Sequence, residues 1–229
     1  MAMTADGKID TVERLGARIS GTADSARVDR LRAESDAIMV GGRTLHSEDP
    51  RLTVRDARLC AEREAAGRPP QPAKVGVSSS IGPPGDVDAL PGAGRFLHDG
   101  GGRVVVCTSE RTSAEGRAWL ELEGAQVVVR GDDRVDLAAS LSVLADLGIE
   151  RLMVEGGSTL VAALLEARLV DELQLAVAPL LFGGTTAPTP VGGVGWSRAA
   201  AKELRLADVY TSDDDDVVLR YLTEPGAER

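Results

Sequence analysis

The chain has 229 residues, 43 % of them apolar, and carries a formal net charge of −10 at pH 7. It is long enough to bury a real hydrophobic core, and the lack of an obvious boundary in its composition favours one domain over residues 1–229. An acidic surface repels phosphate backbones and anionic lipid headgroups, so we expect no nucleic-acid partner and no membrane partner. An anionic small molecule could still bind in a local pocket of arginines or backbone N–H groups.

The two cysteines, Cys60 and Cys107, are too few and too irregularly spaced for a disulfide framework or a metal site. Cys107 lies in an apolar run and is expected to be a small buried side chain. The sequence has no apolar run that approaches the length of a membrane-spanning helix, and no evident signal peptide. A reducing cytoplasm is therefore the expected location, with no bound metal ion.

The first part of the chain mixes helical and extended patterns. Apolar spacing predicts an amphipathic helix over 25–35 and then a buried strand over 36–42 that ends in glycines. An exposed helix is expected over 57–67. The stretch 78–102 is rich in Gly and Pro, which predicts an irregular surface excursion around one short segment at 95–97.

From residue 103 onward, strands and helices alternate. The strands are expected over 103–109, 125–130 and 150–155, and each is followed by a helix, over 113–124, 136–148 and 158–169. Near-continuous apolar strands joined by helices imply a parallel sheet with helices on both faces, and therefore an α/β fold. The run 171–179 alternates like a half-exposed strand, and 215–222 is expected to close the sheet antiparallel. The acidic run 211–216 is expected to be a solvated turn without a metal role.

Two strand-to-helix junctions contain glycine pairs. The sequences MVGGRT (39–44) and MVEGGST (153–159) both run from a strand through two glycines to a possible helix start. Glycines let a diphosphate approach the backbone, the first N–H groups of a helix donate to it, and the hydroxyls of Ser158 and Thr159 add donors. Neither junction matches an established nucleotide-binding motif, so ordinary turns and a dinucleotide crevice both stay open.

Three further features are ambiguous on the residues alone. Glu155, at the mouth of a strand beside helix N-termini, is either a cap or a ligand contact. In EDPRLTVR (48–55), Leu52 could pack against a flat ring and Arg55 could reach an anion, or the segment is an acidic turn followed by a short polar strand. Lys8 follows an Asp-Gly turn, where a lone lysine is usually a solvated surface charge.

Four segments together resemble one known family. They are AMTADGKI, RVDRLRAESDAIMVGGRTLHSEDPRLTVR, LMVEGGSTLVAALLEARLVDEL and VAPLLFGGTTAPT, and they resemble the reductase domain of riboflavin biosynthesis in the same order along the chain. That domain is fused to a deaminase in bifunctional bacterial enzymes and stands alone in archaea and fungi. The resemblance covers most of the chain, and residues 56–150 are its least diagnostic part.

The resemblance implies a dihydrofolate-reductase-like α/β fold with a mostly parallel sheet, helices on both faces and an antiparallel C-terminal strand, usually in a homodimer. It also implies a reduction that uses NADPH as cofactor. The implied substrate is 2,5-diamino-6-ribosylamino-4(3H)-pyrimidinone 5′-phosphate or its deaminated form, whose ribosyl group becomes a ribityl chain.

Carried over residue by residue, the resemblance assigns cofactor, substrate and catalytic contacts. The cofactor positions are Thr44, Glu48, Gly156, Gly157, Ser158 and Thr159, and the substrate positions are Arg32, Leu52 and Arg55. Glu155 falls at the family's substrate carboxylate and Lys8 near the ribose. The ribosyl ring must open to an imine before a hydride can attack. Glu155 could therefore stabilise the developing positive charge while Lys8 bonds the ring oxygen as it becomes a hydroxyl.

Three departures from the family pattern bear on the substrate and on the start of the chain. Glu48 stands where the family usually has Asp, and Gly16 and Arg18 replace a serine and an aromatic contact of some members. The family also has a strand before the Asp-Gly turn, so we expect the natural start to lie further upstream. Two alternatives follow: a reductase of the same fold acting on another substrate such as a pterin, and a degenerate nucleotide-binding domain without catalysis.

Overall fold

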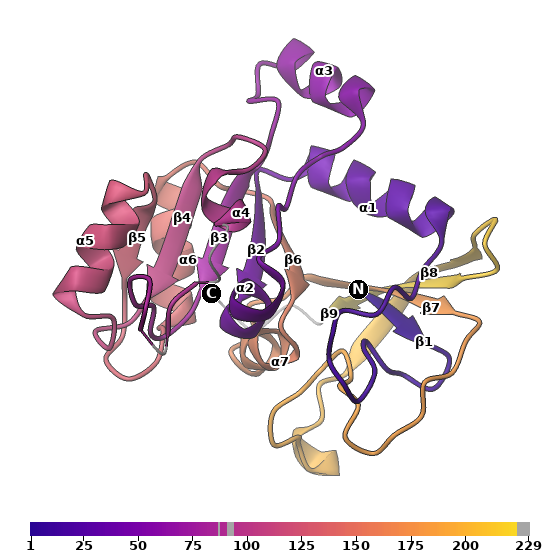
Figure 1. The fold of residues 1–229 in the computed structure, drawn as a ribbon. Coiled ribbons are helices and arrows are strands. Elements are labelled where there is room, and N and C mark those ends of the chain that lie inside the picture. The colour runs from indigo at the N-terminus through magenta and orange to yellow at the C-terminus, as the bar shows by residue number, and fades with distance from the viewer. Residues whose placement is uncertain (87, 91–93, 224–229) are drawn as a thin grey trace. The chain divides into compact units, whose positions relative to one another are not determined.

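The structure is a computed structural model, and it describes residues 1–86, 88–90 and 94–223 (Figure 1). The chain divides into two compact units. Residues Val28–Gly157 form one, the parallel-sheet unit, and Met1–Arg27 together with Ser158–Arg229 form the other, the mixed-sheet unit. The mixed-sheet unit is therefore assembled from both ends of the chain. The expected organisation as one domain stays a prediction.

The parallel-sheet unit contains a five-stranded sheet in which all neighbouring strands are parallel. Its order is β5 (Gln126–Val129), β4 (Val104–Thr108), β3 (Ala73–Val77), β2 (Ala37–Gly41) and β6 (Leu152–Gly156). Every residue of β2, β3 and β4 is buried, as is usual for parallel strands that are covered on both faces. The expected alternation of strands and helices and the α/β class are confirmed.

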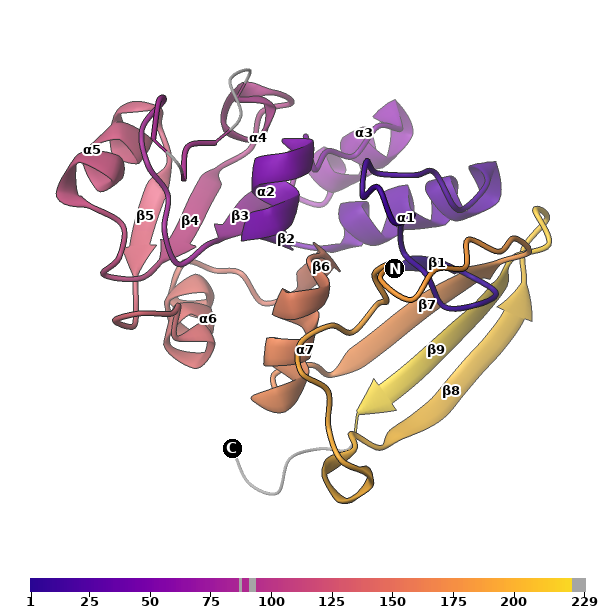
Figure 2. The ribbon, with the colours of Figure 1, turned by 60° about the horizontal axis from the view of Figure 1, so that its bottom comes forward.

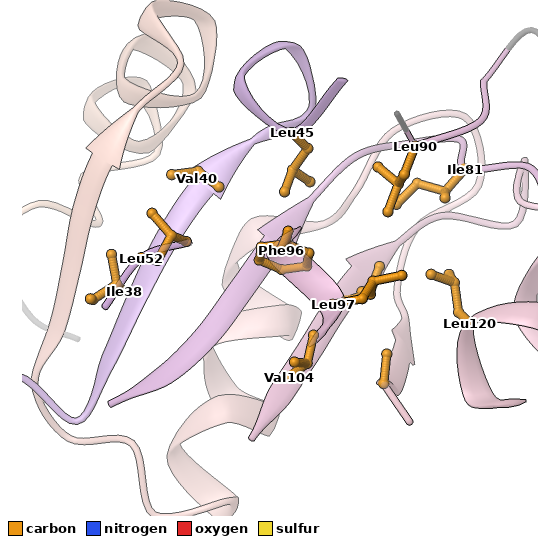
Figure 3. Close-up of a cluster of buried hydrophobic side chains, with 12 residues drawn as sticks. Ile38, Val40, Leu45, Leu52, Ile81, Leu90, Phe96, Leu97, Val104 and Leu120 are labelled. Atoms are coloured by element: carbon orange, nitrogen blue, oxygen red, sulfur yellow. The ribbon is translucent and has the colours of Figure 1, made fainter. Parts of the chain in front are cut away.

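Helices cover both faces of this sheet (Figure 1). The helices of this unit are α1 (Thr22–Glu34), which enters it at Val28, α2 (Gly42–Glu48), α3 (Ala57–Ala65), α4 (Arg95–His98), α5 (Ala114–Leu122) and α6 (Leu137–Asp146). Of these, α3 does not cover the sheet, since its Leu59 packs with Ala33 of α1 and Val54. Leu45 of α2 and Leu120 of α5 share a buried cluster with Val106 of β4 (Figure 3). The next residue, Cys107, points to the opposite face because side chains alternate along a strand, and its thiol contacts Ser140 of α6. Burial raises the pKa of this thiol to about 12, which fits the predicted inert core cysteine.

Strand β3 was not predicted, because a lysine and a glycine interrupt its apolar pattern. Lys74 is only 1 % exposed, and its Nζ donates a hydrogen bond to the Asp99 carbonyl at 2.9 Å and lies 5.7 Å from the ring centre of Phe96. A Cβ on Gly76 would lie 2.8 Å from Cδ1 of Leu45 and 3.1 Å from Cζ of Phe96. Lys74 and Gly76 can therefore lie in a buried strand because of the residues that pack against them. Those residues are distant in sequence, so the local pattern does not predict the strand.

The prediction that the segment 78–102 lies on the surface is wrong for part of its length. The short helix α4 forms at the predicted place, but the segment also fills the core above β3 and β4 (Figure 3). Its buried members are Ile81, Leu90, Phe96 and Leu97. Residues 87 and 91–93 of this stretch lie outside the described residues. The large apolar side chains among these turn residues are buried because they cover the apolar side chains on one face of the sheet.

The mixed-sheet unit contains a four-stranded sheet (Figure 2). Its order is β1 (Ala2–Thr4), β7 (Glu172–Ala178), β9 (Val217–Thr223) and β8 (Leu204–Thr211), and the unit also holds α7 (Ser158–Glu166) and the 3₁₀ helix η1 (Arg198–Ala200). β1 pairs parallel with β7, and the other neighbours are antiparallel. The C-terminal strand β9 is antiparallel as expected, but it belongs to this sheet and does not close the parallel one. β1 precedes the Asp-Gly turn, and an upstream extension of the chain stays a prediction.

The described residues contain no helix that combines the length and the apolar character needed to span a membrane.

The acidic run between β8 and β9 is more than a solvated turn. Oδ2 of Asp214 accepts a hydrogen bond from the Ala23 N–H at 2.6 Å, so the turn caps the first turn of α1. Asp216 is 1 % exposed, and its Oδ2 has no hydrogen-bond partner among the described residues. Burial raises the pKa of Asp216, the negative charge of Asp24 raises it further, and a hydrogen bond from the Gly21 N–H acts in the opposite direction. The expected solvation is therefore wrong for Asp216.

The Asp216→Asn substitution should stabilise the protein at about pH 8 and change little at about pH 4. Because the pKa of Asp216 is raised in the folded state, its contribution to stability is full below the unfolded pKa and is lost as the pH rises through the folded pKa. A buried group without its partner costs about 1–3 kcal/mol, and each kcal/mol shifts the melting temperature of a chain of this length by about 2–4 °C. Thermal unfolding followed by circular dichroism across this pH range measures the effect.

Asp213→Asn is the matched control, since Asp213 is exposed in the same turn. An Asp216→Asn protein that loses the same stability at every pH would contradict the assignment.

Candidate active site

Helix α1 turns two charged residues to one side. Asp29 and Arg32 are three positions apart, a spacing that places both side chains on one face of a helix. Asp29 is 4 % exposed, and the side chain of Arg32 is 17 % exposed. Buried charges need partners. The parallel-sheet unit supplies one for each: the segment 53–56 for Asp29, and Glu155 of β6 for Arg32.

Arg32 and Glu155 form a two-bond ion pair. Nε of Arg32 donates to Oε1 of Glu155 at 2.5 Å and Nη2 donates to Oε2 at 2.6 Å, while Nη1 donates to the Thr53 carbonyl at 2.8 Å. Burial lowers the pKa of the Arg32 guanidinium, but the hydrogen bonds and charge of Glu155 outweigh it and raise the pKa overall. The Glu155 side chain is 15 % exposed. Its carboxylate is therefore held in one orientation while part of it stays accessible to a ligand.

The segment that follows α2 is irregular and does not form the short polar strand that the sequence left open. Leu52 has a positive φ of 50° and is 4 % exposed within the buried cluster of the sheet (Figure 3). The Gln71 side chain accepts from the Val54 N–H at 2.8 Å and donates to the Val54 carbonyl at 2.9 Å, as a neighbouring strand would. Leu52 thus serves the core, and its contact with a substrate ring stays a prediction.

Asp29 holds the next part of this segment. Its carboxylate oxygens accept hydrogen bonds from the Arg55 N–H at 2.9 and 3.0 Å, and Oδ2 also accepts from the Asp56 N–H at 2.8 Å. Nε of Arg55 lies 3.7 Å from Oδ1 of Asp29, and the Arg55 side chain is 62 % exposed. Asp29 therefore fixes the backbone of Arg55.

The two glycine junctions lie next to each other. β2 and β6 are parallel neighbours with Val40 paired to Gly156, so both strands end at the same edge of the sheet. A Cβ on Gly156 would lie 3.4 Å from Oγ1 of Thr44, in the first turn of α2. Gly157 has a φ of +90°, which favours glycine, and α7 begins at Ser158. The structure thus brings Thr44 and Gly156 together. Because residue 156 is a glycine, no side chain lies between its backbone and the Thr44 hydroxyl.

A hydroxyl-rich run that the sequence left unassigned lies at the same edge. Residues 78–80 are three serines directly after β3. A Cβ on Gly42 would lie 2.8 Å from Oγ of Ser78, and the Ser109 hydroxyl, after β4, donates to the Ser79 carbonyl at 2.7 Å. Three serines directly after a strand would have marked this run as a candidate part of the site, but the sequence analysis did not predict β3.

A third glycine segment packs on the start of α7. The Gly192 N–H donates to the Ser158 carbonyl at 3.0 Å, and a Cβ on Gly192 would lie 2.8 Å from the Ser158 hydroxyl oxygen. Gly193 has a φ of +81° and faces Ala162, where a Cβ would lie 3.6 Å away. Ser158 is half-buried under this contact, and Thr159 is exposed. The signal in the sequence is the repeat VGGVG at 191–195, which the motif analysis passed over.

Lys8 and Glu48 are the predicted residues that the structure constrains least. Lys8 is half-buried and follows β1, where its N–H donates to Oγ1 of Thr4 at 2.9 Å. It belongs to the mixed-sheet unit and Glu155 to the parallel-sheet unit, so their joint action stays a prediction. Glu48 ends α2 with an exposed side chain, and its carbonyl accepts a hydrogen bond from Arg95.

Comparison with solved structures defines the class of the fold. RibD of Acinetobacter baumannii matches 97 % of this chain with a TM-score of 0.74 at 25 % identity, and this chain spans 56 % of that protein. A pyrimidine reductase-like protein of Corynebacterium diphtheriae matches 98 % of this chain with a TM-score of 0.74 at 19 % identity, over 90 % of its own length. The chain has the dihydrofolate-reductase-like α/β fold of these proteins, as predicted.

Sequence comparison identifies the family. Residues 1–219 match the family model described as the RibD C-terminal domain, and the chain belongs to this family. Proteins of Archaeoglobus fulgidus and Methanothermobacter thermautotrophicus, both named 2,5-diamino-6-ribosylamino-4(3H)-pyrimidinone 5′-phosphate reductase, are each 42 % identical to it. The matches cover 84 % of both chains for the first and 95 % of this chain and 93 % of the relative for the second.

The Gly192→Ala substitution should weaken nucleotide binding with little effect on folding. The new Cβ would displace the Ser158 hydroxyl and the first turn of α7, whose first N–H groups have no partner within the helix. We expect the dissociation constant for NADPH, the predicted cofactor, to rise about tenfold, or about 1.4 kcal/mol. Isothermal titration calorimetry measures it, with Val191→Ala as the control. Unchanged NADPH affinity in the Gly192→Ala protein would exclude this turn from the site.

Proposed function

We propose that the chain is an NADPH-dependent reductase of riboflavin biosynthesis. Its substrate would be 2,5-diamino-6-ribosylamino-4(3H)-pyrimidinone 5′-phosphate or the deaminated form, and its product the ribityl compound. Family membership and the names of the relatives support this assignment. The single observation that carries it is the position of Glu155, oriented by Arg32 and one residue before the glycine that faces Thr44.

The carboxyl edge of the parallel sheet fits a dinucleotide. Open α/β sheets bind nucleotides beyond the carboxyl ends of their strands. Here Gly156 leaves the space beside Thr44 open, and Ser158 and Thr159 begin an α-helix whose first N–H groups favour a phosphate. We assign Thr44, the 156–159 turn and Glu48 to NADPH, which supplies a hydride when bound.

The proposed reaction adds a hydride to one carbon and a proton to one oxygen. Ring opening of the ribosylamine gives an iminium at the former anomeric carbon, the ring oxygen takes a proton and becomes a hydroxyl, and hydride addition to the iminium carbon completes the ribityl chain. A carboxylate has about four lone-pair sites, and Arg32 occupies one on each oxygen of Glu155. Glu155 can therefore face the cationic carbon while paired, and Lys8 is assigned to the ring oxygen.

The Glu155→Gln substitution should lower the turnover number by about 10²–10³-fold, the usual cost of removing one electrostatic contact to a transition state. The assay follows loss of NADPH absorbance with the ribosylamine phosphate, and with dihydrofolate and NADH as comparison reactants. Glu166→Gln is the control, because Glu166 is exposed at the end of α7. Purified protein that consumes NADPH with dihydrofolate only, or with neither compound, would refute the proposal.

We also propose that the protein works in the cytoplasm as a homodimer formed through the mixed sheet. The pairing register of β7, β9 and β8 places a continuous group of uncharged side chains on one face of this sheet, including eight large apolar or aromatic ones that are exposed or half-buried. This apolar face consists of Leu173, Leu175, Val177, Leu206, Val209, Val217, Leu219 and Tyr221. An exposed sheet face is usually polar, so an apolar one indicates a partner surface. Two chains of charge −10 repel each other, and an uncharged face is where they can meet.

A Leu206→Glu, Val209→Glu double variant should be monomeric. Leu206 and Val209 are 50 % and 52 % exposed on β8, the edge strand of the apolar face, and two charges there would be buried against two more from the partner. Light scattering after gel filtration should give twice the chain mass of 23.9 kDa for the wild type and one chain mass for the variant. Tyr210→Glu, on the opposite face of β8, is the control. A wild-type protein of one chain mass would refute the dimer.

A further inference from the structure

Thr4, the last residue of β1, is the centre of the turn that carries Lys8. Thr4 is fully buried, its N–H donates to the Lys8 carbonyl at 2.8 Å, and its hydroxyl oxygen accepts from the Lys8 N–H at 2.9 Å. The Thr4 carbonyl accepts from the Gly7 N–H at 2.8 Å, and Gly7 has a φ of +76°, which favours glycine. One buried residue therefore fixes both the N–H and the carbonyl of Lys8.

The carboxylate of Asp6 ties this turn to the segment that follows β7. Oδ1 of Asp6 accepts from the Thr4 hydroxyl at 2.5 Å and from the Phe182 N–H at 3.2 Å, and Oδ2 accepts from the Gly183 N–H at 2.7 Å. The hydrogen bond from Thr4 lowers the pKa of Asp6, burial acts in the opposite direction, and the two N–H groups lower the pKa further. Asp6 therefore binds these three donors as an anion at neutral pH.

The hydrogen bonds from Lys8 through Thr4 to Asp6 have a fixed direction. An ionised carboxylate only accepts, so the Thr4 hydroxyl gives its one proton to Asp6 and can only accept from the Lys8 N–H. The position of the Lys8 backbone therefore depends on the hydroxyl of Thr4 and on the charge of Asp6.

The turn is also attached at both of its ends to the segment that follows β7. β1 and β7 are parallel neighbours, so the residues that follow them start at the same edge of the mixed sheet (Figure 2). The Ala5 N–H donates to the Leu180 carbonyl and the Ile9 N–H to the Pro188 carbonyl, both at 2.9 Å. Within the part of the chain that the structure describes, the Lys8 ammonium has no hydrogen-bond or ion-pair partner. A ligand can therefore bind this ammonium without displacing a partner.

We infer that Thr4 and Asp6 are positioning residues for Lys8: they hold its backbone where the ammonium can meet the ring oxygen of the substrate as that oxygen becomes a hydroxyl. The inference rests on the proposed function, which assigns Lys8 to this oxygen. A lysine ammonium is a point charge on a flexible four-carbon stem, so fixing where the stem begins limits where the charge can go. Thr4 and Asp6 would thus act on the reaction through Lys8 alone.

Substitutions at the two residues should change the turnover number and not the KM. Thr4→Val, which keeps the shape of the side chain and removes its hydroxyl, should lower the turnover number by about 10²-fold, the cost of misplacing a reacting group by about 1 Å. The KM for the ribosylamine phosphate should change less than about threefold. Thr4→Ser, which keeps the hydroxyl, should restore most of the turnover. Asp6→Asn should resemble Thr4→Val, because an amide accepts on one side only and turns an N–H toward one of the three donors.

Asp136→Ala is the matched control for a lost backbone contact. Asp136 is exposed, as Asp6 is, and accepts a hydrogen bond from the Ala139 N–H at 3.0 Å at the start of α6. Its loss should lower the melting temperature and leave the turnover number unchanged. If circular dichroism shows that Thr4→Val is unfolded, Asp6→Asn carries the test, since its side chain is exposed.

A double-mutant cycle shows whether Asp6 and Thr4 act through Lys8. In a Lys8→Met protein, Asp6→Asn and Thr4→Val should change the turnover number less than about twofold, because the group that they position is absent. An effect of the same size with and without Lys8 would overturn the inference.

Proteolysis tests the fixed turn without the reaction. Trypsin cleaves after lysine, and the rate of cleavage after Lys8 should rise about tenfold in Asp6→Asn and in Thr4→Val, the effect of one or two lost hydrogen bonds on the population of the opened turn. Asp136→Ala should be cleaved there at the wild-type rate, and mass spectrometry of the fragments identifies the bond. Wild-type rates in Asp6→Asn and Thr4→Val would overturn the inference. Wild-type protein that resists cleavage after Lys8 but does not consume NADPH with the ribosylamine phosphate would overturn the proposed function alone.

Discussion

The parallel pairing of β2 with β6 determines which residues lie together at one edge of the five-stranded sheet. Parallel strands end at the same edge of a sheet, so the residues that follow β2 and β6 are neighbours although they are far apart in sequence. Thr44 meets Gly156 there, and Glu155 lies one residue inside the edge. Only two residues, 35–36, connect the end of α1 to the start of β2. With so short a connection, α1 has to run back along the sheet. The same pairing therefore brings Arg32 to Glu155.

The buried cationic side chains of this unit differ in the kind of partner that they bind. Arg63 is 2 % exposed and donates to the carbonyls of Pro69, Ala33 and Ser35, and Lys74 is 1 % exposed and donates to a carbonyl. Burial lowers the pKa of both groups. Arg32 is the contrasting case, since pairing with Glu155 raises its pKa despite burial. Carbonyl partners serve packing, whereas a carboxylate partner that stays partly accessible can also serve a ligand.

The sequence predicts those elements whose pattern is local. Alternating apolar runs and helix periods place β4, β5, β6 and the helices between them, and the glycine pairs mark both junctions at the sheet edge. The sequence analysis does not predict strand β3, because Lys74 and Gly76 are accommodated by residues far from them in sequence: Lys74 by Phe96 and Asp99, and Gly76 by Leu45 and Phe96. The edge strand β8 escapes because its residues are almost all exposed and give no burial pattern. The pattern of a short segment cannot predict packing against residues that are distant in sequence.

The same limit applies to the site. The sequence analysis places Arg32, Arg55 and Glu155 in one site and treats the two arginines alike, because residue type says nothing of pairing. In the structure Arg32 pairs with Glu155 at 2.5 Å, and Nε of Arg55 lies 3.7 Å from Oδ1 of Asp29. The structure also draws attention to Asp29 and Gly192, which the sequence analysis left unassigned. Asp29 accepts a hydrogen bond from the Arg55 N–H, and Gly192 packs on the start of α7.

Charge alone cannot explain how such an acidic chain would hold two phosphorylated molecules. Asp29 and Glu155 balance Arg32 and Arg55, so the formal charges of these four residues sum to zero. The array therefore offers no net attraction at a distance, and the rest of the chain repels anions. Affinity has to come from contacts made at short range, where a guanidinium held in place and the first N–H groups of a helix need no reorganisation to meet a phosphate. The hydrogen bonds around α1 hold backbone and side chains in fixed positions. In the proposed site, this fixed orientation would take the place of an excess of positive charge.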